Sequence, residues 1–336
     1  MKVLNIMLSR DVGGIQQAFL DYSKALDKQK VKVYNVTSIF AKVNLVASHQ
    51  TIKLPNFGLW DIFSKLYLIF IILLLKPDVV IAHGNRAISF SKSIFSPVII
   101  GVAHNYSTKY LRKCDYVIAL TEQSYNRLIK ENFLPEKLFI VPNMIDLPSI
   151  AMKSYRQPVI IGTMARFVKK KGVDVLIQAL AKLEQKGLLF KAVIGGAGEE
   201  KSHLLNVVEQ LGFKKEHVEF IGWIENKQQF FQDIDIFVLP SLDEPFGIIV
   251  LEAIAHKVPI IATKTEGPLD IIKDYSYLLC DINSSEDLVD KLTILINDYS
   301  LAQRYTDSNY VRLKNTYDIE VVSKKLYSYL QSTIVD

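Results

Sequence analysis

Short apolar runs alternate with segments of helical spacing along this sequence, and that alternation limits the possible folds more than any other feature. Apolar runs stand at 2–8, 31–39, 77–83, 96–104, 115–121 and 137–143. Between the first two, one helical stripe holds Ile15, Phe19, Tyr22 and Leu26. Strand and helix patterns in alternation build parallel sheets with helices on both faces, so the sequence predicts an α/β, doubly wound, Rossmann-like fold.

The alternation stops in a polar stretch at 147–158 and then restarts. A chain of 336 residues is long enough for about two domains. We therefore expect one Rossmann-like domain over 1–147 and a second over 158–316, with a last helix at 317–336 that packs back on the first. Ligands of such sheets bind beyond the C-terminal strand ends, so a cleft between the two domains is the expected site.

The composition narrows the choice of partner. A formal net charge of +5 is mild for this length and does not indicate a nucleic-acid-binding protein. It suits a phosphate-bearing ligand or an anionic membrane surface equally well. Cys114 and Cys280 lie far apart without metal-ligand spacing, which favours free thiols in the reducing cytoplasm. The first residues lack the pattern of a signal peptide and indicate a strand instead.

One segment, 62–75, is almost entirely apolar. It is shorter than the roughly 20 residues that span a bilayer, and Lys65 interrupts it. We predict a helix that is either buried or lies on a membrane surface. Aromatic residues in and beside the segment are Phe57, Trp60, Phe63 and Tyr67.

Two loops that follow strands carry residues suited to phosphate. Gly13 and Gly14 stand between a strand and a helix, where the backbone N–H groups favour an anion, although a plain tight turn explains them as well. Arg166 and Lys171 follow the strand at 159–166 and could hold a diphosphate. A solvated basic loop is the alternative, and the intervening lysines are assigned to it.

His83 and His104 each stand at the end of an apolar run, which places both near the expected ligand site. A single histidine at such a position is more often a hydrogen-bonded structural residue than a catalyst, and two at equivalent positions favour a functional role modestly. The acidic pair in "DID", 233–235, is similar to a metal motif, but two acids make a poor site. We expect no bound metal and no cofactor.

Glu244 and Glu252 stand eight positions apart in "EPFGIIVLEAIA". Gly247 precedes a helical segment, so Glu244 would lie at the helix start and Glu252 on its early flank. The free N–H groups between them could bind phosphate, with the carboxylates accepting from sugar hydroxyls. A dipole-stabilising acid and a surface acid are the alternative, and the physics alone does not choose.

A family resemblance favours the ligand-binding interpretation of Glu244 and Glu252. The segment "SLDEPFGIIVLEAIAHKVPIIAT" resembles the E-P-F-G-x-x-x-x-E-A-x-A signature of retaining glycosyltransferases of family 4, which have the GT-B fold of two Rossmann-like domains facing a cleft. Five more segments are similar to the family pattern in the same order: "DVGGIQQ", "GVAHNYS", "VPNMID", "MARFVKKKG" and "IGGAGEE". The departures are Gln16 where an acid is common, Met144 where glycine is common, a single glycine, Gly267, where two are common, and Asp270 in place of a glutamate. None of them removes a residue of the phosphate site.

The resemblance implies a role for each residue. The catalytic group would be Glu244, His104, Arg166 and Lys171. The donor nucleotide sugar would be held by Gly13, Gly14, Arg166, Lys171, Gly222, Phe246, Gly247, Ile248 and Glu252. Glu244 would bind donor-sugar hydroxyls, Glu252 the ribose, and His104 the sugar near the reacting carbon.

The expected protein is a retaining hexosyltransferase that uses a UDP-sugar or a GDP-sugar. Its acceptor would be a cell-envelope glycan or a lipid-linked glycan of the lipopolysaccharide type, bound by the first domain. The enzyme would be cytoplasmic and peripheral on the inner face of the membrane. The alternative is a GT-B-fold scaffold or subunit that binds a nucleotide sugar without transferring it.

Overall fold

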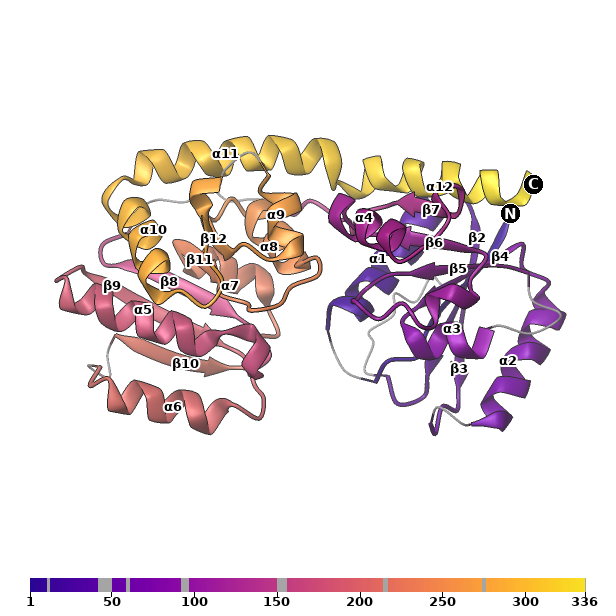
Figure 1. The fold of residues 1–336 in the computed structure, drawn as a ribbon, viewed down its shortest axis with the longest axis horizontal. Coiled ribbons are helices and arrows are strands. Elements are labelled where there is room, and N and C mark those ends of the chain that lie inside the picture. The colour runs from indigo at the N-terminus through magenta and orange to yellow at the C-terminus, as the bar shows by residue number, and fades with distance from the viewer. Residues whose placement is uncertain are drawn as a thin grey trace. The chain divides into compact units, whose positions relative to one another are not determined.

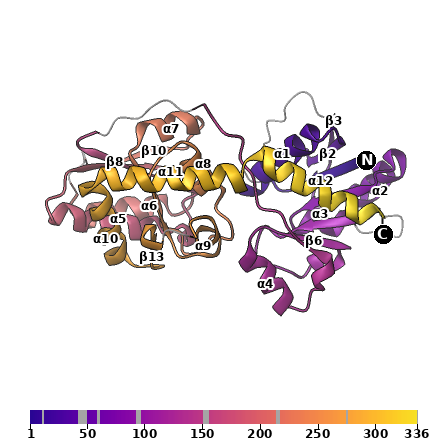
Figure 2. The ribbon, with the colours of Figure 1, turned by 90° about the horizontal axis from the view of Figure 1, so that it is seen from above.

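The computed structural model describes residues 1–10, 13–41, 50–58, 61–91, 97–149, 156–213, 217–273 and 276–335. Asp11, Val12, Trp60 and residues 150–155, half of the stretch expected to link the domains, therefore lie outside the described residues. The chain divides into two compact units (Figures 1 and 2). Unit 1 comprises 1–146 and 316–336, and unit 2 comprises 147–315.

Unit 1 is built on a sheet of seven parallel strands in the order β3-β2-β1-β4-β5-β6-β7. The strands are β1 (Lys2–Met7), β2 (Lys32–Ser38), β3 (Gln50–Leu54), β4 (Val79–His83), β5 (Val98–Val102), β6 (Tyr116–Ala119) and β7 (Leu138–Ile140). The α-helices of this unit are α1 (Gly14–Lys28), α2 (Ile62–Leu75), α3 (Asn85–Ser91), α4 (Glu122–Lys130) and α12 (Ile319–Val335).

Unit 2 is built on a sheet of six parallel strands in the order β10-β9-β8-β11-β12-β13. The strands are β8 (Val159–Met164), β9 (Phe190–Gly195), β10 (Val218–Gly222), β11 (Ile236–Leu239), β12 (Ile260–Thr263) and β13 (Leu279–Cys280). The α-helices are α5 (Val173–Gln185), α6 (Lys201–Gln210), α7 (Lys227–Asp233), α8 (Ile248–Ala255), α9 (Glu266–Ile271), α10 (Ser285–Asn297) and α11 (Tyr299–Thr316).

Each sheet reverses its strand order once. In unit 1 the reversal lies between β1 and β4, and in unit 2 between β8 and β11. Strands β4, β11 and β12 are buried along their whole length, as strands of a parallel sheet covered on both faces must be. The crevice beyond the C-terminal ends at such a reversal is the usual ligand position in open α/β sheets. The prediction of two doubly wound parallel α/β domains is confirmed.

The apolar segment at 62–75 forms α2 with the predicted bounds. Asp61 caps its N-terminus, with the carboxylate accepting from the backbone N–H of Ser64 at 2.9 Å. Lys76 ends it in the left-handed conformation. One face of the helix is buried in the unit 1 core through Leu68, Ile71 and Ile72.

Two elements were not predicted from the sequence. β3 is an edge strand whose residues are polar at three of five positions, so it lacks an apolar run. α3 begins two residues after β4 ends and is only seven residues long, too short to show a helical period.

The last helix, α12, belongs to unit 1. Leu326 and Leu330 on this helix are fully buried. Ser323 accepts a hydrogen bond from Gln29, the residue after α1, at 2.9 Å. The Tyr329 ring stacks on Phe139 of β7 with centroids 4.5 Å apart.

Unit 2 brings its loops together at a glycine where a side chain would clash with the backbone of the neighbouring loop. Gly172, which precedes α5, has φ +60°, and a Cβ there would lie 2.1 Å from the carbonyl oxygen of Pro240. The loops after β8 and β11 thus touch backbone to backbone. Gly187, after α5, has φ +75° with open space around it.

These two glycines form a matched pair for a test. Gly187→Ala should cost about 1 kcal/mol of unfolding free energy, since it only places Ala in the left-handed region. Gly172→Ala should cost a further ~1–3 kcal/mol because it adds a backbone clash. Urea unfolding followed by Trp223 fluorescence in a Trp60→Phe background measures both. Equal losses for the two variants would contradict the close approach of the loops.

Candidate active site

An ion pair joins the loops that follow the two strands at the reversal of the unit 2 sheet. Lys171 ends a short 3-10 turn after β8, and Glu244 lies between β11 and α8. Lys171 Nζ is 2.5 Å from Glu244 Oε2, and the side chains are only 21% and 13% exposed. The structure therefore brings two of the predicted catalytic residues into direct contact at the C-terminal edge of the sheet.

Backbone contacts fix the position of this pair. Leu242 N–H donates to the carbonyl of Lys170 at 2.8 Å, which ties the two loops together. Gly267 N–H donates to the carbonyl of Glu244 at 3.0 Å. A Cβ on Gly267 would lie 1.9 Å from the carbonyl oxygen of Phe246, so only glycine lets α9 approach this closely. The family pattern commonly has two glycines where this chain has Gly267 alone, and here Gly267 closes the loop that carries Glu244.

Arg166 lies in the same loop as Lys171, and its side chain is exposed. The next residue, Phe167, is fully buried, and its N–H donates to the carbonyl of Ala197 at 2.8 Å. The backbone beside Arg166 is therefore held, while its guanidinium makes no hydrogen bond or ion pair with any residue that the structure describes. This leaves a fixed but unpaired cation available to a ligand.

The start of α8 lies next to Glu244. Gly247 precedes the helix in the left-handed conformation, with φ +82° and no side-chain cap. Phe246 is buried, and Ile248 is the first helical residue. Because no side chain caps this end, the first helical N–H groups and the helix dipole can serve an anion.

Glu252 faces a cation that the sequence did not predict. Lys227, the first residue of α7, lies with its Nζ 2.6 Å from Glu252 Oε1. The other carboxylate oxygen, Oε2, is buried and has no hydrogen-bond partner within the described ranges. A buried carboxylate oxygen without a donor is unfavourable, so it indicates a place for a ligand hydroxyl.

Two more buried oxygens at the same edge of the sheet have no hydrogen-bond partner among the described residues. They are the hydroxyls of Thr163 in β8 and of Ser241 just after β11, each 1% exposed. Gly222 ends β10 with φ +75° and accepts a hydrogen bond from Gly196 N–H at 2.6 Å. The adjacent Trp223 is 54% exposed. The strand ends at this edge thus carry two unsatisfied hydroxyls and, after β10, an exposed aromatic ring.

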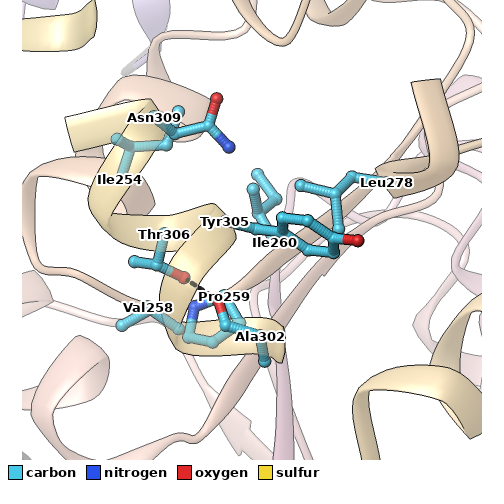
Figure 3. A pocket seen from close by; sticks show the side chains of 9 residues that line it. All are labelled: Ile254, Val258, Pro259, Ile260, Leu278, Ala302, Tyr305, Thr306 and Asn309. Carbon is cyan, nitrogen blue, oxygen red and sulfur yellow. Dashed lines mark hydrogen bonds between the residues drawn. The ribbon is translucent and has the colours of Figure 1, made fainter. Parts of the chain in front are cut away.

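A small pocket in unit 2 lies elsewhere (Figure 3). It is lined by Ile254, Val258, Pro259, Ile260, Leu278, Ala302, Tyr305, Thr306 and Asn309. Val258 and Pro259 precede β12, so the pocket lies toward the N-terminal edge of that strand, opposite to the edge that carries the predicted site. Its lining is mainly apolar and includes no charged side chain for a diphosphate.

In unit 1, Gly13 and Gly14 open α1 as predicted. Gly13 is extended at φ 172°, and a Cβ there would meet nothing within 4 Å. The geometry of the turn therefore does not itself require glycine at position 13. The N-terminus of α1 has no side-chain cap, which leaves N–H groups available to an anion.

His83 and His104 are in contact with each other. His83 ends β4 and is buried, whereas His104 lies two residues beyond β5 and is partly exposed. His83 Nδ1 lies 2.9 Å from His104 Nε2, and the rings stack with centroids 5.1 Å apart. Desolvation by the surrounding protein lowers the pKa of His104 to about 4. Burial, together with the neighbouring His104, lowers the pKa of His83 well below 6.5.

The suspected metal motif has a structural role. Asp235 accepts from the backbone N–H of Ile160 at 2.9 Å, and its other oxygen lies 3.5 Å from Arg156. Among the described residues, no three His, Cys, Asp or Glu side chains cluster in a way that could hold a metal ion.

Comparison with known proteins agrees with this architecture. The family model of glycosyltransferase family 4 matches residues 12–148, and the model of glycosyl transferases group 1 matches residues 151–312. The two matches together run through both units. The chain belongs to glycosyltransferase family 4. It is therefore a glycosyltransferase.

Relatives of this glycosyltransferase act on several cell-envelope polymers. It is 26% identical over 265 residues to the lipopolysaccharide core biosynthesis glycosyltransferase LpsE of Rhizobium meliloti. The match covers 76% of this chain and 75% of LpsE. It is 27% identical over 237 residues to a poly(ribitol-phosphate) alpha-N-acetylglucosaminyltransferase of Staphylococcus aureus, covering 68% of this chain and 47% of the relative. The fold matches that of Anabaena HepE in complex with UDP-glucose, with a TM-score of 0.84, 19% identity, and coverage of 99% and 100% of the two chains.

The histidine pair predicts a pH dependence of stability. Because burial lowers both histidine pKa values in the folded protein, the unfolded chain binds protons that the folded chain does not at pH below 6.5. The free energy of unfolding should therefore have its full value above pH 6.5. It should fall by about 2 kcal/mol per histidine between pH 7 and 5. Urea unfolding at each pH measures it. The loss should shrink in His104→Gln and persist in His203→Gln, an exposed control on α6; an unchanged loss in His104→Gln would contradict the assignment.

Proposed function

We propose that this glycosyltransferase moves a hexose, with retention of anomeric configuration, from a UDP-sugar or GDP-sugar to a lipid-linked or glycan acceptor of the cell envelope. The observation that carries the proposal is the group of charges at the C-terminal edge of the unit 2 sheet. There the Lys171–Glu244 pair, the unpaired Arg166 and the start of α8 lie on loops held by backbone contacts.

The cations suit the leaving group. Transfer leaves negative charge on the nucleoside diphosphate and positive charge at the anomeric carbon. Arg166, Lys171 and the N-terminus of α8 supply positive potential for the departing diphosphate, and fixed donors in a site of this kind are usually the main electrostatic contribution. Gly13 and Gly14 at the uncapped start of α1 would add backbone N–H groups to the phosphates.

The carboxylates suit hydroxyl groups. Glu252 Oε2 has no partner and would accept from the ribose, while Lys227 holds Oε1 in place. Glu244 would accept from hydroxyls of the donor sugar and stabilise positive charge at its reacting carbon. The exposed Trp223, next to Gly222, would meet the base. We do not assign the two glutamates to hydrolysis, since they have different partners and different positions relative to the strands.

The donor and acceptor classes follow the relatives. HepE has been crystallised with UDP-glucose, and Staphylococcus aureus TarM with UDP. The first relative above acts in lipopolysaccharide core biosynthesis, and the second glycosylates poly(ribitol-phosphate). These names support a nucleotide-sugar donor and a cell-envelope acceptor for this chain.

Donor binding by the unit 2 site can be tested directly. Calorimetry against UDP, GDP, ADP and their common hexose conjugates, without metal, should give saturable binding of one nucleotide series. Arg166→Ala should weaken it by about tenfold or more, because it removes a charge-assisted contact. Lys169→Ala removes an exposed lysine of the same loop and should leave it unchanged.

Transfer has a separate control. Glu244→Ala should abolish transfer while the circular dichroism spectrum stays that of the parent protein. Transfer at near the parent rate by Glu244→Ala would refute its role, and a panel without any binding nucleotide would refute the donor site.

We further propose that unit 1 places the enzyme on the inner surface of the cytoplasmic membrane through α2. Its outward side is apolar along the whole helix and comprises Ile62, Phe63, Leu66, Tyr67, Phe70, Leu73 and Leu74. Phe63 is 86% exposed. A helix on the surface of a water-soluble domain normally carries polar residues on this side. We call this set the apolar face of α2.

The surrounding charges favour an anionic lipid surface as the occupant. Residues 62–76 include Lys65 and Lys76 and no acidic residue. The carboxylate of Asp61 is occupied by the N–H of Phe57 and by Ser64. No described helix is long and apolar enough to cross a membrane, and α2 with its 14 residues would lie in the interface. A second copy would instead bring like-charged lysines together.

Vesicle flotation tests the membrane proposal. The protein should bind vesicles of phosphatidylethanolamine and phosphatidylglycerol and should bind phosphatidylcholine vesicles weakly. Phe63→Glu should reduce binding by at least about tenfold, since it removes a buried Phe from the lipid. Leu189→Glu, at a 76% exposed leucine of unit 2, should not. Equal losses, or concentration-dependent dimers in place of flotation, would overturn the assignment.

A further inference from the structure

A chain of buried hydrogen bonds runs through the first strands of unit 1 and ends at His104. Asn5 on β1 pairs in register with Asn35 on β2, and its side-chain Nδ2 donates to Asn35 Oδ1 at 3.1 Å. The same Nδ2 donates to the carbonyl oxygen of Phe19 at 3.1 Å. Asn5 Oδ1 then lies 2.9 Å from Nε2 of His83. Asn5 is fully buried and His83 is 2% exposed, so water cannot substitute for these partners.

The carbonyl of Phe19 fixes the orientation of the Asn5 amide. A backbone carbonyl only accepts hydrogen bonds, so the group facing it must be the NH₂ of Asn5. The amide oxygen of Asn5 therefore faces His83, and it can only accept. His83 must donate from Nε2. The proton on His83 Nε2 is assigned only from the fact that the Phe19 carbonyl oxygen and the Asn5 amide oxygen can accept hydrogen bonds but cannot donate them.

The same logic passes to the second ring. A neutral imidazole carries one N–H, so His83, which donates through Nε2, has a lone pair on Nδ1. His104 Nε2 lies 2.9 Å from that lone pair and must carry the proton. Neutral His104 then has its own lone pair on Nδ1. That atom makes no hydrogen bond with any part of the chain that the structure describes.

We infer that His83 is a positioning residue: with Asn5 it holds His104 in the tautomer protonated on Nε2, so that Nδ1 of His104 accepts a hydrogen bond from a ligand hydroxyl. A phosphate oxygen at neutral pH also only accepts and cannot be that partner. That the hydroxyl belongs to a sugar rests on the proposed function. The orientation of His104 does not depend on it.

The packing around His83 explains why its ring does not rotate. Tyr22 contacts it edge-on with centroids 4.9 Å apart, and Phe19 does so from 5.8 Å. The lowered pKa of both histidines keeps the pair neutral at pH 7, which the argument requires. Of the described titratable residues, Tyr22, whose own pKa burial raises, packs against the His83 ring, and His83 and His104 face each other.

Nuclear magnetic resonance of ¹⁵N-histidine-labelled full-length protein at pH 7.5 tests the inference without any ligand. The protein has six histidines, and His→Gln variants assign them. We expect a scalar coupling across the N–H···N bond, with the proton on His104 Nε2 and not on His83 Nδ1. A proton on His83 Nδ1, or an imidazolium at either position, would overturn the inference.

Two variants at position 83 separate positioning from a merely structural role. His83→Leu removes both donor and acceptor, so the Nδ1 signal of His104 should move toward the protonated position as the two tautomers exchange. His83→Gln retains a donor and an acceptor and should keep the parent signal. If His83→Leu folds and leaves His104 unchanged, His83 does not position it. If His83→Leu does not fold, the test rests on the other two measurements. A proton on His104 Nε2 in the parent protein and an unchanged His104 signal in His83→Gln would support positioning, and the opposite results would refute it.

The ligand part is tested with UDP-glucose and UDP, or GDP-mannose and GDP, whichever pair binds in the calorimetric panel. The sugar conjugate should shift the Nδ1 signal of His104 in the direction of hydrogen-bond acceptance, and the parent diphosphate should not. Equal shifts with both, or no shift with a bound conjugate, would refute the hydroxyl assignment. Failure of the proposed function appears separately, as absence of binding in the panel.

Discussion

Parallel strand pairing imposes the constraint on which the functional sites of this enzyme depend. All strands of a unit end at the same edge of its sheet, and the strand order of each sheet reverses once. The reversal lies between β1 and β4 in unit 1 and between β8 and β11 in unit 2. At a reversal the connecting segments leave in opposite directions along the sheet, so the strand ends there are not covered by their own connections. Most of the candidate residues follow these four strands or lie on them, whereas His104 follows β5 and Gly222 ends β10. The strand topology thus determines which chain positions can contact a ligand, whatever side chains stand there.

The ion pair of Lys171 and Glu244 shows how such a position is prepared for charge. Each side chain alone would be an unpaired charge in a partly buried place, and together they offset that cost. An ammonium has three donors and a carboxylate several acceptor positions, so each side chain can bind a further partner while the pair stays in contact. The pair formed by Lys227 and Glu252 differs, because one carboxylate oxygen is already without a donor.

The sequence predicted the parts of this structure that depend on local patterns. Helix α2 has the bounds that its apolar run indicated, and the signature around Glu244 identified the family. The contact between Glu252 and Lys227 could not be predicted, because it joins residues 25 positions apart through the folding of two helices. Asn5 gave a signal that was overlooked: a polar residue inside an otherwise apolar central strand requires a buried partner. The edge strand β3 had too few apolar residues to be recognised.

The position of α12 in the chain has a consequence for how the protein is made. Unit 1 is assembled from residues 1–146 and 316–336, with the whole of unit 2 encoded between them. Leu326 and Leu330 complete the unit 1 core only once the ribosome has added that last segment. During synthesis unit 2 can close its own sheet first, while unit 1 waits with the surface for α12 uncovered. The N-terminal unit can therefore reach its final packing only after the whole of unit 2 has been synthesised.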